Sequence, residues 1–141
     1  MASFDMKKVK ILSVFLGIVS LSFGLLKLIS PFKDWYLAQI EASSLPGYSY
    51  FLGIVGETMA GLAFLIPFLI LKNNKQKHFL LTLANSITII IMLAAIIVHL
   101  IPSVPADVLP LKIKPPIIPF TLMTAAILNQ VTLHKSIKNH N

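Results

Sequence analysis

The stretch FLLTLANSITIIIMLAAIIVHLI, residues 79–101, decides the fold of this chain. It holds no aspartate, glutamate, lysine or arginine, and its one histidine, His99, lies near its end. A helix of about 20 apolar residues crosses the ~30 Å hydrocarbon core of a bilayer. A helix is also favoured there because it satisfies every backbone polar group within the segment. The stretch therefore predicts a membrane-spanning helix.

Three further apolar runs, residues 9–29, 50–71 and 116–133, have the same character. The last is the shortest, and Pro115 and Pro116 suit a helix start, where a missing N–H costs little. The composition agrees, because 56% of the residues are hydrophobic, 12% are charged and the mean hydropathy is +0.84. A soluble domain carries about 25% charged residues. We therefore predict an all-α integral membrane protein, a four-helix bundle.

The lysines predict the orientation of the bundle. Eight of them lie in the N-terminal segment, the second loop and the C-terminal segment, and three lie in the first and third loops, with Lys27 left out because it lies inside a span. Cytoplasmic segments of membrane proteins carry the excess of lysine and arginine. Both ends of the single domain, residues 1–141, are therefore predicted on the cytoplasmic side.

The same lysines lie between apolar runs, which favours the lipid bilayer over nucleic acid as the partner of this basic chain. The lysine-, isoleucine- and asparagine-rich composition is typical of an AT-rich bacterial genome. The expected location is thus the cell membrane of a bacterium, its inner membrane, crossed several times by the chain.

The first outer loop carries a shorter helical pattern. Between residues 31 and 41, aromatic and apolar side chains alternate with charged ones, and Ser30 and Pro31 suit the start of a helix. The pattern predicts a short amphipathic helix at the membrane interface. An aromatic belt at the outer surface is expected from Trp35, Tyr36, Tyr48 and Tyr50.

Three ionisable residues lie within the apolar runs: Lys27, Glu57 and His99. Charges inside a membrane are costly, so each needs a physical reason. Glu57 lies ~10 Å from the outer end of its helix at 1.5 Å per residue. Lys27 and His99 lie near the outer ends of theirs. All three are expected at similar height in the outer half, pointing at one another as a polar, ligand-binding cluster.

Small or polar residues recur at helical spacing on each span, which is typical of the inward face of a membrane helix. The supporting interior is expected to comprise Ser20, Gly24, Gly53, Gly61, Asn85, Thr88, Thr121 and Asn129. On the fourth span this face is expected to follow Thr121, Ala125, Leu128 and Thr132, with Asn129 beside it. A second, weaker polar layer near the cytoplasmic end is expected from Asn85, Ser86, Asn129 and Gln130.

Each of these residues can also be explained by a purely structural role. Lys27 can snorkel to the outer head groups. Glu57 can form a buried ion pair with Lys27, or be protonated and bonded to a neighbour, without any further role. His99 can be a plain interfacial histidine. Threonines in spans most often bond to their own helix backbone.

Several kinds of chemistry find no support in the sequence. There is no cysteine, which excludes thiol redox chemistry and thiolate metal sites. No phosphate-binding loop, zinc-protease motif or nucleophile elbow is present. The histidines lack metal-ligand spacing, and His99 alone within a span argues against bis-histidine haem. We therefore assign no catalytic residue and no metal ligand.

Three segments carry a resemblance to a known family: GIVSLSFGLLKL at residues 17–28, GIVGETMAGL at 53–62 and MLAAIIVH at 92–99. In this order they resemble the DoxX-like family of small four-helix membrane proteins, and they are also similar to the related chaperones of nicotinic acetylcholine receptors. The resemblance implies a place beside thiosulfate:quinone oxidoreductase or oxidative-stress complexes, although many members of the family have no known activity.

Three functions remain open on this basis. The first is a non-catalytic or accessory subunit of a membrane redox complex that binds a quinone or a lipid in an outer polar cavity. The second is an assembly factor or chaperone that contacts another membrane protein, or a second copy of itself, through its spans. The third is a small proton-coupled transporter that uses Glu57 and Lys27. We rank them in that order.

Overall fold

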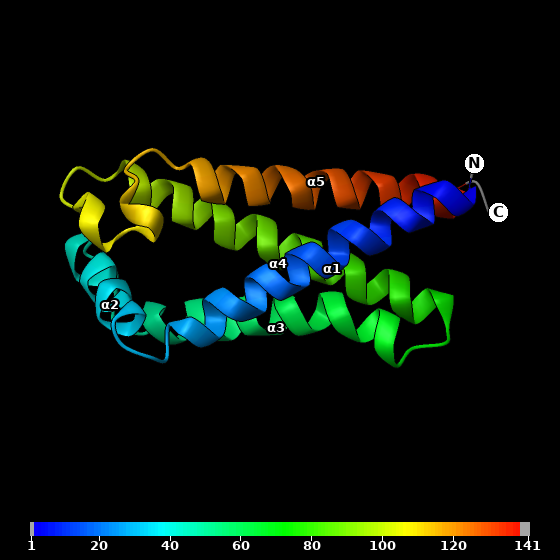
Figure 1. Cartoon of the computed structure of the whole chain (residues 1–141), viewed down its shortest axis with the longest axis horizontal. Coiled ribbons are helices and arrows are strands. Elements are labelled where there is room, and N and C mark those ends of the chain that lie inside the picture. The colour runs from blue at the N-terminus through cyan, green and yellow to red at the C-terminus, as the bar shows by residue number, and fades with distance from the viewer. Residues whose placement is uncertain (1, 139–141) are drawn as a thin grey trace.

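The computed structural model describes residues 2–138 and is all-helical over that range (Figure 1). Five α-helices and two short 3₁₀ turns follow one another within it. In chain order they are α1 (Ala2–Leu26), α2 (Phe32–Ala42), α3 (Ser49–Leu69), α4 (Asn74–Leu100), η1 (Ala106–Val108), η2 (Pro110–Lys112) and α5 (Ile117–Lys138). The predicted all-α class is confirmed, and α2 is the short helix predicted in the first outer loop.

Four of the helices in the described range are long and apolar enough to cross a membrane. They contain the segments Met6–Leu26, Ser49–Leu69, Asn74–Leu100 and Ile117–Ser136, which overlap the four predicted spans. The chain is therefore a multi-pass membrane protein. The first helix ends earlier than predicted because the backbone N–H groups of Leu28 and Ile29 bond to carbonyls three residues back, which closes tight turns before Pro31.

The four spans form a ring in which α1 packs against α3 and α5, and α4 packs against the same two helices. At one end of the bundle lie the start of α1, the end of α5 and the tight α3–α4 turn (Figure 1). Asn73 caps α4 in that turn, since its side chain accepts a hydrogen bond of 2.8 Å from the Lys75 N–H. The start of α1 and the end of α5 thus lie at the same end of the bundle. The assignment of that end to the cytoplasmic side stays a prediction.

At the opposite end, α3 and α4 diverge, and α2, η1 and η2 all lie at that end of the bundle (Figure 1). A small apolar cluster joins these segments, because Trp35 of α2 packs against the buried Val104, Val108 and Leu109 of the third loop. The segments therefore hold together as one cap over the predicted outer end.

Glycine sets the spacing between α1 and α3. An added Cβ at Gly61 would lie 2.7 Å from the backbone nitrogen of Leu21, and one at Gly24 would lie 2.6 Å from the Thr58 hydroxyl oxygen. Both glycines are buried, as is Ser20 on the same face of α1. The predicted small-residue contact between the first and second spans is therefore present, and it allows the two backbones to approach closely.

The predicted inward face of the fourth span is wrong for Thr121 and Leu128 and right for Asn129. Leu122, Ala126, Asn129 and Leu133 face the interior of the bundle, whereas Thr121 and Leu128 are exposed. The hydroxyls of Thr121, Thr124 and Thr132 each donate to the carbonyl four residues earlier, at 2.8, 2.9 and 2.8 Å. A threonine satisfied in this way can face lipid, so its polarity does not identify the inward face.

We expect Gly61→Ala to lower the free energy of unfolding by about 1–3 kcal/mol, because its new methyl group meets the α1 backbone and forces the two helices apart. The matched control is Gly47→Ala, since a Cβ at Gly47 meets nothing within 4 Å. Thermal unfolding in detergent micelles measures both variants. Equal midpoints for the two would contradict the close α1–α3 contact.

Candidate functional site

Lys27 and the buried Glu57 form a partly buried ion pair at the predicted outer end of the bundle. The Lys27 Nζ atom lies 2.7 Å from Glu57 Oε2, and the two side chains are 18% and 8% exposed. Glu57 reaches this position from the third turn of α3, and Lys27 directly follows the end of α1. The ion-pair alternative for Glu57 is confirmed, and a Lys27 that snorkels away to the head groups is not what the structure contains.

Two tyrosines hold Lys27 in place. Its ammonium lies 4.0 Å from the centroid of the Tyr36 ring, a cation–π contact, and its backbone carbonyl accepts a hydrogen bond of 3.0 Å from the Tyr50 hydroxyl. The Tyr36 hydroxyl donates to the Ser49 carbonyl at 3.2 Å. Gly53 makes room for this arrangement, since any Cβ there would collide with the Tyr36 hydroxyl.

Of the predicted outer aromatic belt, Tyr36 and Tyr50 are therefore turned inward, and Trp35 is packed in the cap. Tyr48 is exposed. The inward turn is favoured because a tyrosine ring can cover a lysine ammonium while its hydroxyl satisfies a nearby carbonyl.

Tyr36 remains a neutral phenol throughout the physiological range. Burial raises the pKa of Tyr36 to about 12, with smaller contributions from the negative charge of Glu57 and from Tyr50. The hydroxyl is therefore a hydrogen-bond donor, not a phenolate, wherever the protein is folded at ordinary pH.

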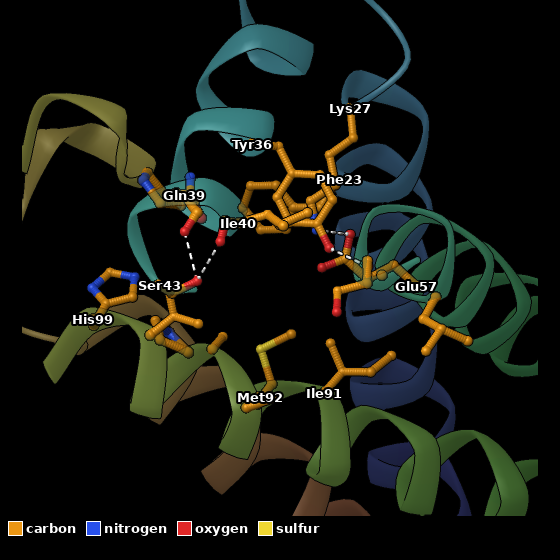
Figure 2. Close-up of a pocket in the computed structure, with 18 of the residues that line it drawn as sticks. Phe23, Lys27, Tyr36, Gln39, Ile40, Ser43, Glu57, Ile91, Met92 and His99 are labelled. Atoms are coloured by element: carbon orange, nitrogen blue, oxygen red, sulfur yellow. Dashed lines mark hydrogen bonds and ion pairs between the residues drawn. The ribbon is translucent and has the colours of Figure 1, made fainter. Parts of the chain in front are cut away.

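A cavity of about 410 Å³ lies beside the ion pair. Its walls come from all five helices and from η2, and most of the lining side chains are apolar. Figure 2 shows Ile91 and Met92 rising from α4 toward α2, with Glu57 and Lys27 on one side of the hollow. Gln39 and Ser43 line it from α2. The cavity thus has an apolar body and a polar end, which is the usual character of a small-molecule site.

His99 lines the same cavity from the opposite wall (Figure 2). Its side chain is buried, and its Nδ1 atom lies 3.1 Å from the Lys114 carbonyl oxygen. A carbonyl cannot donate, so Nδ1 carries the hydrogen, and in the neutral ring Nε2 is an acceptor. The expectation that three side chains point at one another is confirmed for Lys27 and Glu57, whereas His99 faces them across the hollow.

Lys114 explains why His99 is held at the wall. Its ammonium donates to the carbonyl of Ile101 at 2.6 Å and to that of Val104, just beyond the end of α4. A lysine in this position adds a charged donor to the carbonyls at a helix end. Lys114 therefore serves the fold, which accounts for one of the lysines in the predicted outer loops that run against the positive-inside pattern.

A second polar layer lies deeper in the bundle, toward its other end. Asn129 Nδ2 donates to Ser13 Oγ at 2.9 Å and to Asn85 Oδ1 at 3.2 Å, and all three residues are buried. Thr88 is buried close by in sequence on the same face of α4. The predicted contact between Asn85 and Asn129 is confirmed, but Ser86 is exposed and donates to the Thr82 carbonyl.

Sequence reasoning missed Tyr36, Gln39 and Ser43 as cavity residues and Ser13 in the deeper layer. Tyr36, Gln39 and Ser43, the residue directly after α2, recur at spacings of three and four, so they share one face. That face could have been found by asking which side of the amphipathic helix carries uncharged polar groups. Ser13 lies seven residues before Ser20 on α1, on the face already identified.

Within residues 2–138, no group of three or more metal-ligating side chains comes together. Comparison with protein-family models, curated proteins and solved structures returns no match for this chain. The fold and the site define a four-span membrane protein with a buried ion pair beside a cavity, and the resemblance to the DoxX-like family stays a prediction.

Removing one partner of the ion pair should destabilise the protein more than removing both. Lys27→Met leaves Glu57 without its buried partner, and we expect a loss of about 3 kcal/mol. The double variant Lys27→Met/Glu57→Gln should lose clearly less than the sum of the two single variants. Unfolding of all four proteins measures this coupling. Additive losses would mean that the two side chains do not interact.

The deeper layer gives a second test. Asn129→Ala removes two hydrogen bonds between helices, and we expect it to cost about 1 kcal/mol. Thr132→Ala on the same helix should be nearly neutral, because that hydroxyl bonds within its own helix. Thermal unfolding midpoints compare the two variants. A larger loss of stability in Thr132→Ala would contradict the finding that Asn129, and not Thr132, faces the interior of the bundle.

Proposed function

We propose that this multi-pass membrane protein binds a quinone or a lipid in its outer cavity, as a non-catalytic accessory subunit of a membrane redox complex. The observation that carries the proposal is the cavity itself. Its volume of about 410 Å³ falls within the ~300–1,000 Å³ of small-ligand sites. Its apolar walls suit a hydrocarbon body, and the polar end at Lys27 and Glu57 suits a head group.

The resemblance to the DoxX-like family supports the redox part of this proposal. The three segments that carry the resemblance contribute Lys27, Glu57 and His99, and all three residues line the one cavity. A shared motif pattern that converges on a single cavity is what a common ligand site would produce. The redox partner and the complex itself belong to the proposal and rest on the resemblance.

An accessory role fits the chemistry of the lining residues better than a catalytic one. Lys27 and Glu57 are bonded to each other, and Tyr36 stays protonated below pH ~12. Groups held in this way position a ligand, whereas a general base has to be free to take a proton at working pH. The transporter alternative requires Glu57 to exchange protons, and proton-dependent uptake by proteoliposomes that is abolished in Glu57→Gln would favour it instead.

Native mass spectrometry of gently purified protein tests the binding proposal. We expect a bound lipid or quinone that is retained by Leu93→Trp and lost from Met92→Trp. Met92 is 5% exposed and points into the cavity, so an indole there fills the ligand space (Figure 2). Leu93 is the adjacent residue, 51% exposed, and faces away. Equal ligand retention by the two variants would contradict binding in this cavity.

A further inference from the structure

We propose that the cavity selects a lipid-soluble molecule with an uncharged, oxygen-bearing head group, and that this molecule enters sideways from the lipid between α3 and α4. The inference rests on the proposed function and narrows it, because it excludes phosphate head groups and names a path. It follows from which lining residues are exposed and from how the charges beside the cavity are paired.

The mouth of the cavity is marked by lining residues that are also exposed. Leu52 on α3 is 63% exposed and Ile90 on α4 is 68% exposed, and Ala94 on α4 is exposed as well. These three are apolar and lie within candidate membrane spans, and the fourth exposed lining residue, Leu45 in the loop before α3, is apolar too. A rim of this kind suits hydrocarbon and not water, so the cavity opens toward the lipid tails.

The side between α3 and α4 is open because the polar contacts near this end of the bundle link other pairs of segments. Lys27 and Glu57 tie the end of α1 to α3, and His99 ties the end of α4 to the segment before α5. Among the hydrogen bonds of the described residues, none joins side chains of α3 and α4 in the outer half. The two helices diverge toward the outer end (Figure 1). The exposed lining residues Leu52 and Ile90, one on each helix, place the mouth between them.

The charges beside the cavity cancel. Lys27 is the one cation and Glu57 the one anion among the described lining residues, and they are 2.7 Å apart. Tyr36 covers the ammonium and is itself neutral. Lys114, whose backbone carbonyl contacts His99, gives its ammonium to two other backbone carbonyls. A phosphate would have to break the ion pair or remain unpaired in a medium of low dielectric, and both are costly.

An uncharged head group avoids that cost. The Lys27 ammonium has three N–H donors, and the bond to Glu57 uses one of them. A carbonyl or hydroxyl oxygen can accept another without disturbing the ion pair. The geometry thus favours quinones and neutral glycerides, which share such oxygens, over phospholipids and fatty acids.

The selectivity is tested with three probes of similar tail length, added to the protein in phosphatidylcholine nanodiscs. Decyl-benzoquinone and dioctanoylglycerol are the two uncharged sources, and dodecyl phosphate is the anion. We expect at least one uncharged probe to bind the wild type on the order of tenfold more tightly than dodecyl phosphate. In Glu57→Gln, which leaves the lysine unpaired, dodecyl phosphate should become the preferred probe. Lys27→Met/Glu57→Gln, again neutral, should not show this gain.

The outcomes separate the two levels of the proposal. If the wild type binds none of the three probes, the proposed function fails. If it binds dodecyl phosphate as tightly as the uncharged probes, the head-group inference fails while the proposed function stands. Preference for the quinone over the glyceride, or the reverse, identifies the source of the uncharged head group.

The path is tested by narrowing the mouth. Ala94→Phe places a ring at the rim, and Ile97→Phe places one on the same helix, at an exposed position outside the cavity. Trp35, the single tryptophan, reports quinone binding by fluorescence quenching in stopped-flow experiments. We expect about tenfold slower association in Ala94→Phe, an intermediate rate in Ala94→Leu and the wild-type rate in Ile97→Phe. Equal rates in all four proteins would overturn the lateral path.

Discussion

The ion pair between Lys27 and Glu57 is the interaction on which the α2-covered end of this bundle depends. Either charge alone would be costly inside a membrane, so the two side chains have to meet. Their meeting joins the end of α1 to α3, beside the close approach of the two helices at Gly61. It also helps to explain the position of α2, because Tyr36 of that helix covers the Lys27 ammonium.

A second constraint comes from the deeper polar layer, where Asn129 bonds to Ser13 and Asn85 and so joins α5, α1 and α4. The outer pair joins α1 to α3 instead. With different helices linked at the two depths, α1 crosses the bundle diagonally, as Figure 1 shows, and α3 and α4 stay close at their connecting turn but separate beyond it. The cavity thus results from the positions of the polar contacts, which let α3 and α4 separate.

Much of this arrangement could be predicted from the sequence, and the parts that could not have a common cause. Long apolar runs are enough to predict the spans. A rare charge such as Glu57 predicts an oppositely charged partner nearby, because an unpaired charge inside a membrane is costly. Thr121 gave no such information, since its hydroxyl bonds to its own helix and tolerates either environment. Tyr36 was ambiguous for a related reason, because an amphipathic ring suits both a membrane interface and a buried cation. In the sequence, Lys114 counts only as a positive charge in the orientation argument. Its role in the structure depends on backbone carbonyls that become its neighbours only in the folded chain.

The pairing of the charges has a consequence for any ligand that reaches the polar end. A buried pair of opposite charges holds its geometry only while neither member is offered a better partner, and at low dielectric a third charge competes strongly. A charged ligand would therefore loosen the contact that joins α1 to α3 and holds α2 in place through Tyr36. An uncharged ligand adds a hydrogen bond to the existing network and leaves those contacts intact. The same interaction that stabilises the α2-covered end of the bundle thereby restricts what the bundle can bind.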